Sequence, residues 1–369
     1  MKYYLVAGER SGDLHGSNLI KGIRENDPDA QFRGWGGDMM QAEGLQLAKH
    51  YKDTAYMGFL EVILNLHKIY GFLKECKADI LTYRPDALIL IDYPGFNLRI
   101  AAFAKKRGLK VFYYISPKVW AWNQKRAIKI KENVDHMFVI FPFETDFYLK
   151  YDYKVNYVGN PLMDAIASFR PDPEFRSKNR IPADKPVIAL LPGSRQQEIT
   201  GMLDIMLRIQ PHFPDHQFVI AGVSNLPASL YEKYISTHNA IIVYEATYDL
   251  LAIAEAALVT SGTATLETAL FNVPEVVCYK TSGLSYSIAK KLIRVPYISL
   301  VNLIMQKEAV KELIQRELNE TNLVNELKLI LPGGAKHQAQ MDDYATLRKL
   351  VGESGASVKA GRLMVSYLN

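Results

Sequence analysis

Short runs of apolar residues recur along the chain, and each is followed by Gly, Pro or Ser and then by an amphipathic segment. The first half holds residues 3–7, 87–91, 111–115 and 137–141, and the second half holds 187–191, 218–221, 241–243, 257–259 and 275–279. Short runs without polar alternation are typical of strands that helices cover on both faces. Intervening stretches such as 14–25 and 97–106 have helical spacing. The pattern therefore predicts an α/β fold with parallel sheets.

A segment rich in proline and charge, residues 169–185, interrupts this rhythm. Because 369 residues exceed one ordinary domain, the segment predicts a linker between doubly wound domains 1–168 and 169–369. Parallel sheets bind ligands at the carboxyl ends of their strands, so we expect a cleft between the two domains. The polar, helical tail from about residue 335 could stay with the second domain, pack back on the first, or pack on a partner chain.

Composition narrows the class of protein only modestly. Hydrophobic residues make up 49% and charged residues 22%, as in globular proteins, and the net charge of +5 suits phosphate groups or an anionic membrane without indicating nucleic acid. The two cysteines, Cys76 and Cys278, lie far apart, which argues against a disulfide framework or zinc site and favours a reducing cytoplasm. We see no signal peptide and no apolar run of about 18 residues, so membrane contact is expected to be peripheral.

Two loops of small residues follow strands in the second half. Ser194 and Arg195 end the first loop, and Gly262 and Thr263 open a helix in the second, with Glu267 one turn further on. Backbone N–H groups at a helix start and an arginine fork both suit a diphosphate, and the Glu267 carboxylate could reach a ribose. The plainer alternatives are a turn-capping Arg195 and an ordinary helix cap. No Walker or dinucleotide fingerprint is present, which argues against ATP and NAD.

Asp92 ends an apolar strand in the first half, where partial burial would raise its pKa and make it a better base. An isolated aspartate at such a position more often caps a turn. Asp27 and Asp29 form an Asp-x-Asp string in a polar loop after a helix, and the histidines form no ligand pattern, so we expect no metal site.

Residues 56–74 are apolar on nearly every helical face. A buried helix is the plain interpretation, and an interfacial segment that lines an acyl-chain entrance is the alternative. Basic residues at 105–107 and 125–131 would add attraction to anionic lipid, or form an ordinary solvated face. The candidate membrane or acyl contacts are Met57, Phe59, Leu60, Ile63 and Leu66.

Several of these segments together resemble the lipid-A-disaccharide synthases over nearly the whole chain. The motifs run in the family's order and include 6–13 (Val-Ala-Gly-Glu-x-Ser-Gly-Asp), 91–97 (Ile-Asp-x-Pro-x-Phe-Asn), 116–122 (Ser-Pro-x-Val-Trp-Ala-Trp), 190–195 (Leu-Leu-Pro-Gly-Ser-Arg), 261–267 (Ser-Gly-Thr-Ala-x-Leu-Glu) and 297–303 (Tyr-x-Ser-Leu-x-Asn-Leu). The resemblance implies the GT-B architecture of two Rossmann-like domains. It further implies an enzyme that needs no cofactor and acts at the cytoplasmic face of the inner membrane.

The implied reaction transfers 2,3-diacylglucosamine from its UDP conjugate to 2,3-diacylglucosamine 1-phosphate, with inversion and without a metal. The products would be the β-1,6-linked disaccharide 1-phosphate and UDP. The resemblance leaves the oligomeric state open, including a homodimer. It implies these roles: Asp92 as base; Ser194, Arg195, Gly262 and Thr263 at the diphosphate; Glu267 at ribose; Asn302 as a further nucleotide-side contact; and Glu9, Ser11 and Asp13 on the acceptor side.

One departure from the family pattern lies beside the expected base, where Gly95 replaces a usual Asp. Asp92 is therefore the single base candidate at this turn. The rival functions are a UDP-sugar 2-epimerase, a transferase to another lipid-linked acceptor, and a non-catalytic binding protein. The order of the first-half motifs argues against the other enzymes, and the presence of Asp92 with Arg195 and Glu267 argues against simple binding.

Overall fold

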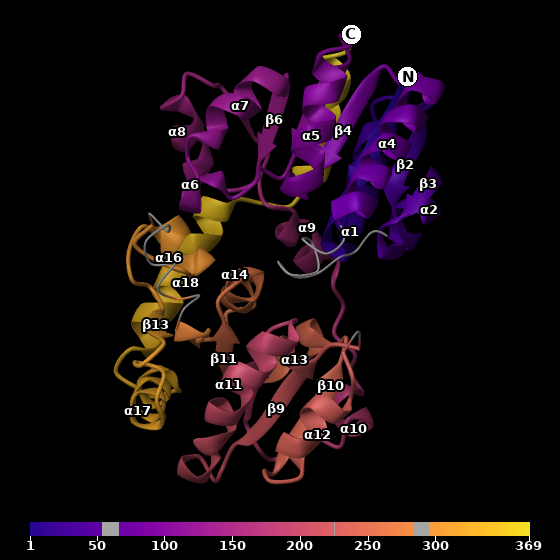
Figure 1. The fold of residues 1–369 in the computed structure, drawn as a ribbon. Coiled ribbons are helices and arrows are strands. Elements are labelled where there is room, and N and C mark those ends of the chain that lie inside the picture. The colour runs from indigo at the N-terminus through magenta and orange to yellow at the C-terminus, as the bar shows by residue number, and fades with distance from the viewer. Residues whose placement is uncertain (54–65, 225, 284–285, 287–294) are drawn as a thin grey trace. The chain divides into compact units, whose positions relative to one another are not determined.

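The computed structural model describes residues 1–53, 66–224, 226–283, 286 and 295–369. It divides into two compact units, and each is a parallel sheet flanked by helices (Figure 1). Unit 1 comprises Met1–Ala167 and Val351–Asn369, and unit 2 comprises Ser168–Leu350. The predicted α/β class is confirmed.

Unit 1 contains a seven-stranded sheet in the order β3-β2-β1-β4-β5-β6-β7. Its strands are β1 (Lys2–Ala7), β2 (Gln31–Gly36), β3 (Leu45–His50), β4 (Ala87–Ile91), β5 (Lys110–Tyr114), β6 (His136–Val139) and β7 (Asn156–Tyr157). Its helices are α1 (Arg10–Arg24), α2 (Asp38–Ala42), α4 (Leu66–Tyr83), α5 (Pro94–Lys105), α6 (Val119–Trp122), α7 (Arg126–Asn133), α8 (Phe143–Leu149), α9 (Pro161–Ser168) and α19 (Ala356–Ser366), with a 3₁₀ turn at Tyr51–Asp53.

Unit 2 contains a six-stranded sheet in the order β10-β9-β8-β11-β12-β13. Its strands are β8 (Val187–Leu191), β9 (Gln217–Gly222), β10 (Ala240–Tyr244), β11 (Ala254–Thr260), β12 (Glu275–Tyr279) and β13 (Lys311–Ile314). Its helices are α10 (Phe175–Lys178), α11 (Gln196–Arg208), α12 (Ser229–Ile235), α13 (Thr247–Ile253), α14 (Thr263–Leu270), α16 (Leu300–Met305), α17 (Glu320–Ile330) and α18 (His337–Val351), with a 3₁₀ turn at Gln210–His212.

Each sheet reverses its direction of growth once. In unit 1 the chain builds outward from β1 to β3 and then returns to place β4 on the other side of β1. In unit 2 the chain builds from β8 to β10 and returns to place β11 beside β8. In doubly wound folds, the loops at the carboxyl ends of the strands on either side of this reversal diverge and leave room for a ligand.

The central strands match the predicted apolar runs, since β1, β4, β8 and β11 lie between helical layers and are largely buried. The pattern missed β2, β3, β7 and β13. Three of these are edge strands, which need no continuous apolar run because one side has no neighbouring strand. In β2 the break is Gly34, whose absent Cβ would lie 1.9 Å from the Leu5 carbonyl oxygen of β1.

The segment predicted as a linker packs as part of unit 2. Phe175 and Ile181 are buried in its core, and the Arg176 guanidinium donates to the Pro182 carbonyl at 2.7 Å. The division between the units falls at Ala167 and Ser168, inside α9.

The end of the chain returns to unit 1 through α19, while α18 stays with unit 2 up to Leu350. Ala360, Met364 and Val365 of α19 are buried in the unit 1 core. The Asp164 carboxylate of α9 accepts from the Gly355 and Ser357 N–H groups and so caps the start of α19. Of the positions left open for the tail, the structure shows packing on unit 1 for Val351–Asn369.

Candidate active site

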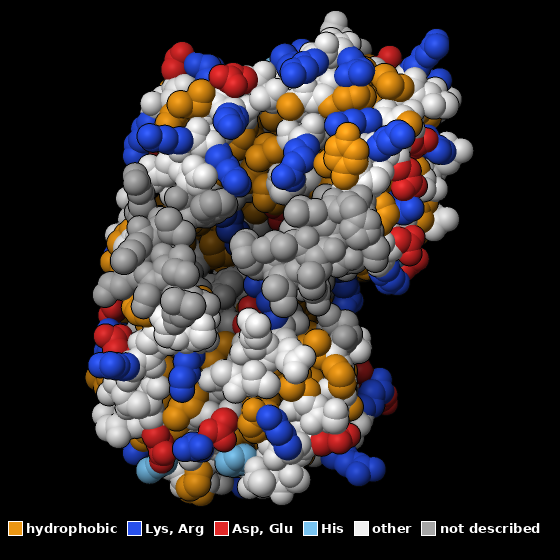
Figure 2. Space-filling model, viewed as in Figure 1, with side chains coloured by type: hydrophobic (Ala, Val, Ile, Leu, Met, Phe, Trp, Pro, Cys, Tyr) orange, Lys and Arg blue, Asp and Glu red, His pale blue; other side chains and the backbone are white. Residues whose placement is uncertain are grey.

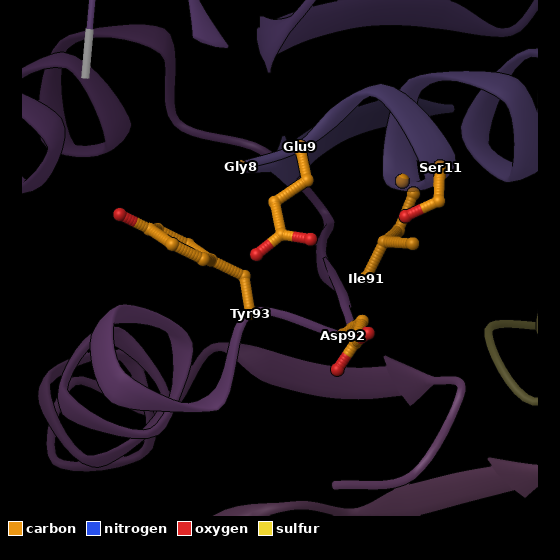
Figure 3. A pocket seen from close by; sticks show the side chains of 7 residues that line it. Gly8, Glu9, Ser11, Ile91, Asp92 and Tyr93 are labelled. Atoms are coloured by element: carbon orange, nitrogen blue, oxygen red, sulfur yellow. The ribbon is translucent and has the colours of Figure 1, made fainter. Parts of the chain in front are cut away.

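A small hollow lies at the chain reversal of unit 1, at the carboxyl ends of β1 and β4. Its lining comes from the loop after β1 with the first turn of α1, and from the end of β4 with the loop after it: Gly8, Glu9, Ser11, Gly12, Ile91, Asp92 and Tyr93. Figure 3 shows the Glu9 side chain between the Tyr93 ring and Asp92, with Ser11 on the side of Glu9 that faces away from Tyr93. The structure therefore brings Glu9 and Ser11 of the 6–13 motif together with Asp92 of the 91–97 motif.

The Asp92 backbone is held in an unusual conformation. Its φ is 42°, and that of Tyr93 is 48°, both in the left-handed region that non-glycine residues rarely adopt. The Asp92 N–H donates to the Tyr114 carbonyl at 3.0 Å. Its carbonyl accepts from the Tyr113 hydroxyl at 2.5 Å and from the Asn97 amide at 2.8 Å. Strained turns of this kind persist only where neighbouring groups hold them, and they cluster at functional sites.

The surroundings of Asp92 suit a general base. Burial and, to a smaller extent, the Glu9 carboxylate raise the pKa of its carboxyl to about 6, while Lys118 acts in the opposite direction. An acid with a pKa near 6 is ionised at neutral pH and is a stronger base than an exposed aspartate.

Contact with the Tyr93 ring explains why residue 8, directly after β1, is a glycine. A Cβ on Gly8 would lie 2.3 Å from the ring, so a side chain there would displace Tyr93 from the wall of the hollow. At Gly95, by contrast, a Cβ would meet nothing within 4 Å. A Cβ at residue 95 would therefore meet no steric obstacle.

Asp13 is buried and faces α2 rather than the hollow. Its carboxylate accepts from the N–H groups of Gly37, Met39 and Met40 at 2.7, 3.1 and 3.0 Å, and so caps the start of α2. These bonds occupy both oxygens. Asp13 therefore holds the start of α2, and the acceptor-side role expected for it from sequence stays a prediction.

A second polar network lies beside the hollow and was not singled out from sequence. The buried Glu144 carboxylate accepts from the Trp120 indole N–H at 3.1 Å and from the Phe141 N–H at 3.0 Å, and so ties the Ser116–Trp122 motif to the end of β6. Burial raises the pKa of Glu144 to about 7. No role was predicted from sequence for Glu144, Asn97 or Tyr113, because only packing determines their hydrogen-bond partners. The signal available from sequence was a polar residue within an apolar segment.

In unit 2 the loop after β8 presents Arg195 at the start of α11. Its side chain is 76% exposed, with a 3.5 Å ion pair to Glu198. The Glu198 carboxylate accepts from the Ser194 and Arg195 N–H groups at 3.0 and 3.2 Å. Glu198 thus occupies the two N–H groups that directly precede α11, and the exposed guanidinium remains accessible to a diphosphate.

The start of α14 differs from that of α11. No side chain among the described residues caps it, and the space beside Gly262 is open for 4 Å around the position of a Cβ. The Ser261 hydroxyl donates to the Ile298 carbonyl at 2.8 Å, which fixes the loop. Thr263 is exposed at the first helical position. Because β8 and β11 are neighbours, this helix start and Arg195 follow adjacent strand ends.

Glu267 lies one turn inside α14 and is largely buried. Its carboxylate accepts from the Tyr248 hydroxyl at 2.9 Å, and burial raises its pKa. Asn302 is fully buried. Its amide oxygen accepts from the Ala309 and Val310 N–H groups, and its nitrogen donates to the Val310 carbonyl and to Glu312. These four bonds use the whole capacity of the amide and fix Asn302 against the segment that leads into β13; its expected nucleotide-side role stays a prediction.

The expected membrane contacts Met57, Phe59, Leu60 and Ile63 lie outside the described residues, as does the side chain of Leu66 at the start of α4. No helix in the described part of the chain is both long and apolar enough to cross a membrane. Within the same residues no group of three or more His, Cys, Asp or Glu side chains is arranged to hold a metal ion.

Two Rossmann-like units, each with polar loops at its chain reversal, define the class of GT-B nucleotide-sugar enzymes. Solved structures agree on the fold. A UDP-N-acetylglucosamine 2-epimerase from Neisseria meningitidis, bound to UDP-N-acetylglucosamine, matches with a TM-score of 0.69 at 13% identity, covering 100% of this chain and 99% of that one. The glycotransferase of kitacinnamycin matches at 0.68 and 12% identity, with the same coverage. At such low identity these matches show the fold alone.

Sequence comparison identifies the family. The family described as lipid-A-disaccharide synthetase matches residues 3–363. The lipid-A-disaccharide synthase of Syntrophus aciditrophicus is 38% identical over 371 residues, covering 99% of this chain and 97% of the relative. Those of Geobacter metallireducens and Coxiella burnetii are 36% and 35% identical, covering 99% and 98% of this chain and 96% of each relative. The chain belongs to the lipid-A-disaccharide synthase family of glycosyltransferases.

Proposed function

We propose that the chain transfers 2,3-diacylglucosamine from UDP-2,3-diacylglucosamine to 2,3-diacylglucosamine 1-phosphate. The products are the β-1,6-linked lipid A disaccharide 1-phosphate and UDP. Family membership supports the substrates. An α-linked donor that yields a β-linked product requires inversion, and a single in-line displacement by the acceptor 6-hydroxyl accounts for it.

Asp92 is the base of this displacement. It accepts the proton of the 6-hydroxyl as the oxygen attacks the anomeric carbon, and Glu9 and Ser11 contact the acceptor beside it. The observation that carries this assignment is the geometry of the hollow: Asp92 is held by bonds to its backbone, beside the Glu9 carboxylate, with a pKa of about 6. General-base catalysis of this type contributes about 10²–10⁴-fold to the rate.

Unit 2 stabilises the departing UDP. The Arg195 guanidinium, exposed after the end of β8, pairs with the diphosphate. The uncapped start of α14 at Gly262 and Thr263 stabilises the negative charge of the diphosphate. Ser194 lies on the same loop, and Glu267 accepts from the ribose hydroxyls. This arrangement neutralises the leaving group without a metal ion.

Unit 1 also presents a surface suited to an anionic membrane. Helices α5 and α7 are neighbours. Lys106 and Arg107 directly after α5, and Lys125 directly before α7, are exposed, as are Lys129 and Ile128 on α7, with Ile128 48% exposed. Figure 2 shows Lys and Arg side chains interspersed with apolar ones on the face of unit 1 in view. Such a mixture favours peripheral binding at the inner leaflet, where the diacylated substrates reside.

Replacement of the base tests the proposal directly. Asp92→Asn should lower kcat by at least about 10²-fold while UDP binding in unit 2 is unchanged. Asp27→Asn, at an aspartate of the same unit outside the hollow, serves as the control and should retain turnover. Full turnover by Asp92→Asn would show that another residue is the base.

A further inference from the structure

Tyr248 lies against the carboxylate that we assign to ribose. It belongs to α13, the helix that precedes β11, and its hydroxyl donates to Glu267 Oε1 at 2.9 Å. Glu267 comes from α14, on the other side of β11 in the chain. The bond therefore joins the two helices that precede and follow the strand leading into the Gly262 loop.

The Tyr248 ring is held in place independently of this bond. Phe169 packs edge-on against it with ring centroids 5.5 Å apart, and Phe271, which directly follows α14, lies 5.0 Å away. The three aromatic rings fix where the hydroxyl lies. Since burial raises the pKa of Tyr248, the hydroxyl stays protonated and can only donate to an ionised Glu267.

We infer that Tyr248 is a positioning residue for nucleotide specificity, which orients the Glu267 carboxylate to read the ribose hydroxyls of the UDP donor. The inference rests on the proposed donor role of Glu267. A free glutamate side chain samples several rotamers, and ordering it on binding opposes affinity. A carboxylate can accept about four hydrogen bonds, so the bond from Tyr248 leaves capacity for both ribose hydroxyls.

This role differs from simple stabilisation of unit 2. If Tyr248 only packs against Phe169 and Phe271, removal of its hydroxyl should affect stability and leave the preference for ribose unchanged. If it orients Glu267, removal of the hydroxyl should weaken binding of a ligand with both ribose hydroxyls more than binding of a ligand that lacks the 2′-hydroxyl. Phenylalanine retains the ring and removes the hydroxyl alone.

The experiment compares binding of UDP and of 2′-deoxy-UDP by calorimetry to the wild-type chain, Tyr248→Phe and Tyr231→Phe. Tyr231 is the matched control, because its buried hydroxyl in the same unit accepts from the Val223 N–H at 3.2 Å and has no bond to Glu267. We expect the wild type to prefer UDP by about tenfold, as for one hydrogen bond to a charged group. Tyr248→Phe should bind UDP several-fold more weakly and lose most of the preference for UDP over 2′-deoxy-UDP, whereas Tyr231→Phe should keep the preference.

The outcomes separate the inference from the function on which it rests. A Tyr248→Phe protein that retains the wild-type preference overturns the inference and leaves the donor role of Glu267 standing. A wild type that binds both nucleotides equally overturns the ribose role of Glu267, and the inference with it. If Tyr248→Phe does not fold, Glu267→Asp provides the second test: its shortened carboxylate cannot meet a fixed hydroxyl and ribose together, so an unchanged preference would overturn the inference.

Discussion

At the scale of single residues, opposite charges on two neighbours shift the pKa of Asp92 in opposite directions. Glu9 raises the pKa of Asp92 and Lys118 lowers it, around a value of about 6 set mainly by burial. Because the base must be ionised to accept a proton, kcat/KM should fall as the pH drops through about 6.

The fall in kcat/KM at low pH is the acidic limb of the pH profile. Removing the charge of Glu9 and removing that of Lys118 should move this limb in opposite directions. Glu9→Gln removes a neighbouring negative charge, which lowers the pKa of Asp92 and moves the limb to lower pH. Lys118→Met removes a positive charge, which raises the pKa of Asp92 and moves the limb to higher pH. The pH dependence of kcat/KM for the two variants measures both shifts. A limb that stays in place in both variants would contradict the assignment of Asp92 as the titrating base.

The Tyr113 hydroxyl should matter for catalysis through the backbone of Asp92. Tyr113→Phe leaves the Asp92 carbonyl with the Asn97 amide as its side-chain donor and loosens the left-handed turn. We expect kcat to fall about tenfold with little change in KM, since a small displacement of a catalytic group is costly. Tyr153→Phe is the control, because its hydroxyl donates to the Val134 carbonyl elsewhere in unit 1. Equal effects of the two variants would show that the hydroxyl is merely structural.

The sequence predicted which residues lie at the strand ends, but it did not predict their hydrogen-bond partners. Asp92, Glu9 and Ser11 were predictable because each follows an apolar run, and parallel strands gather such positions at one edge. Tyr113 and Tyr248 were not, because their bonds span 21 and 19 residues and depend on packing. For buried Asp13 and Asn302 the sequence did not reveal the backbone N–H groups that they accept from, since the residue types that bind ligands are also those that cap helices and turns.

At the scale of secondary-structure elements, α19 completes unit 1 from the far end of the chain. It crosses α1 at two glycines, Gly22 and Gly361. A Cβ on Gly361 would lie 2.4 Å from the Gly22 carbonyl carbon, and a Cβ on Gly22 would lie 2.5 Å from the Ser357 oxygen. The backbones are therefore in contact, and neither position has room for a side chain. The sequence pattern left the destination of this helix open because its apolar face suits either unit.

This crossing makes a specific stability prediction. Gly361→Ala should destabilise the protein by about 2–4 kcal/mol, because backbone atoms cannot yield as a flexible side chain can. Gly71→Ala is the matched control on α4, where a Cβ meets nothing within 4 Å, and it should be neutral or stabilise by up to about 1 kcal/mol. Urea denaturation measures both. Equal stability of the two variants would contradict the close crossing.

At the scale of the whole molecule, the apolar runs predicted both parallel sheets, while several edge strands escaped the pattern. The order of the strands, with a reversal beside β1 and another beside β8, could not be read from the runs themselves. It is this order that brings Glu9 to Asp92 in unit 1 and sets Arg195 beside the Gly262 loop in unit 2.

Membrane binding should depend on the charge of the α5–α7 surface. Replacing Lys125 and Lys129 with Glu should weaken binding to vesicles that contain anionic lipid, with an effect on the order of 1 kcal/mol per lysine removed, and the effect should shrink as salt is raised. Lys178→Glu and Lys336→Glu, at exposed lysines of unit 2, make the matched control. Vesicle co-sedimentation measures the difference. Equal loss in both pairs would show that only net charge matters.

We propose that the chain joins two acylated sugars with inversion, and its products test this proposal. The experiment incubates the purified protein and a chelator with UDP-2,3-diacylglucosamine and 2,3-diacylglucosamine 1-phosphate, then determines UDP release and the anomeric configuration of the product by NMR. We expect one UDP for each β-1,6-linked disaccharide 1-phosphate. An α-linked product, or UDP release without a disaccharide, would show that the proposed reaction is wrong.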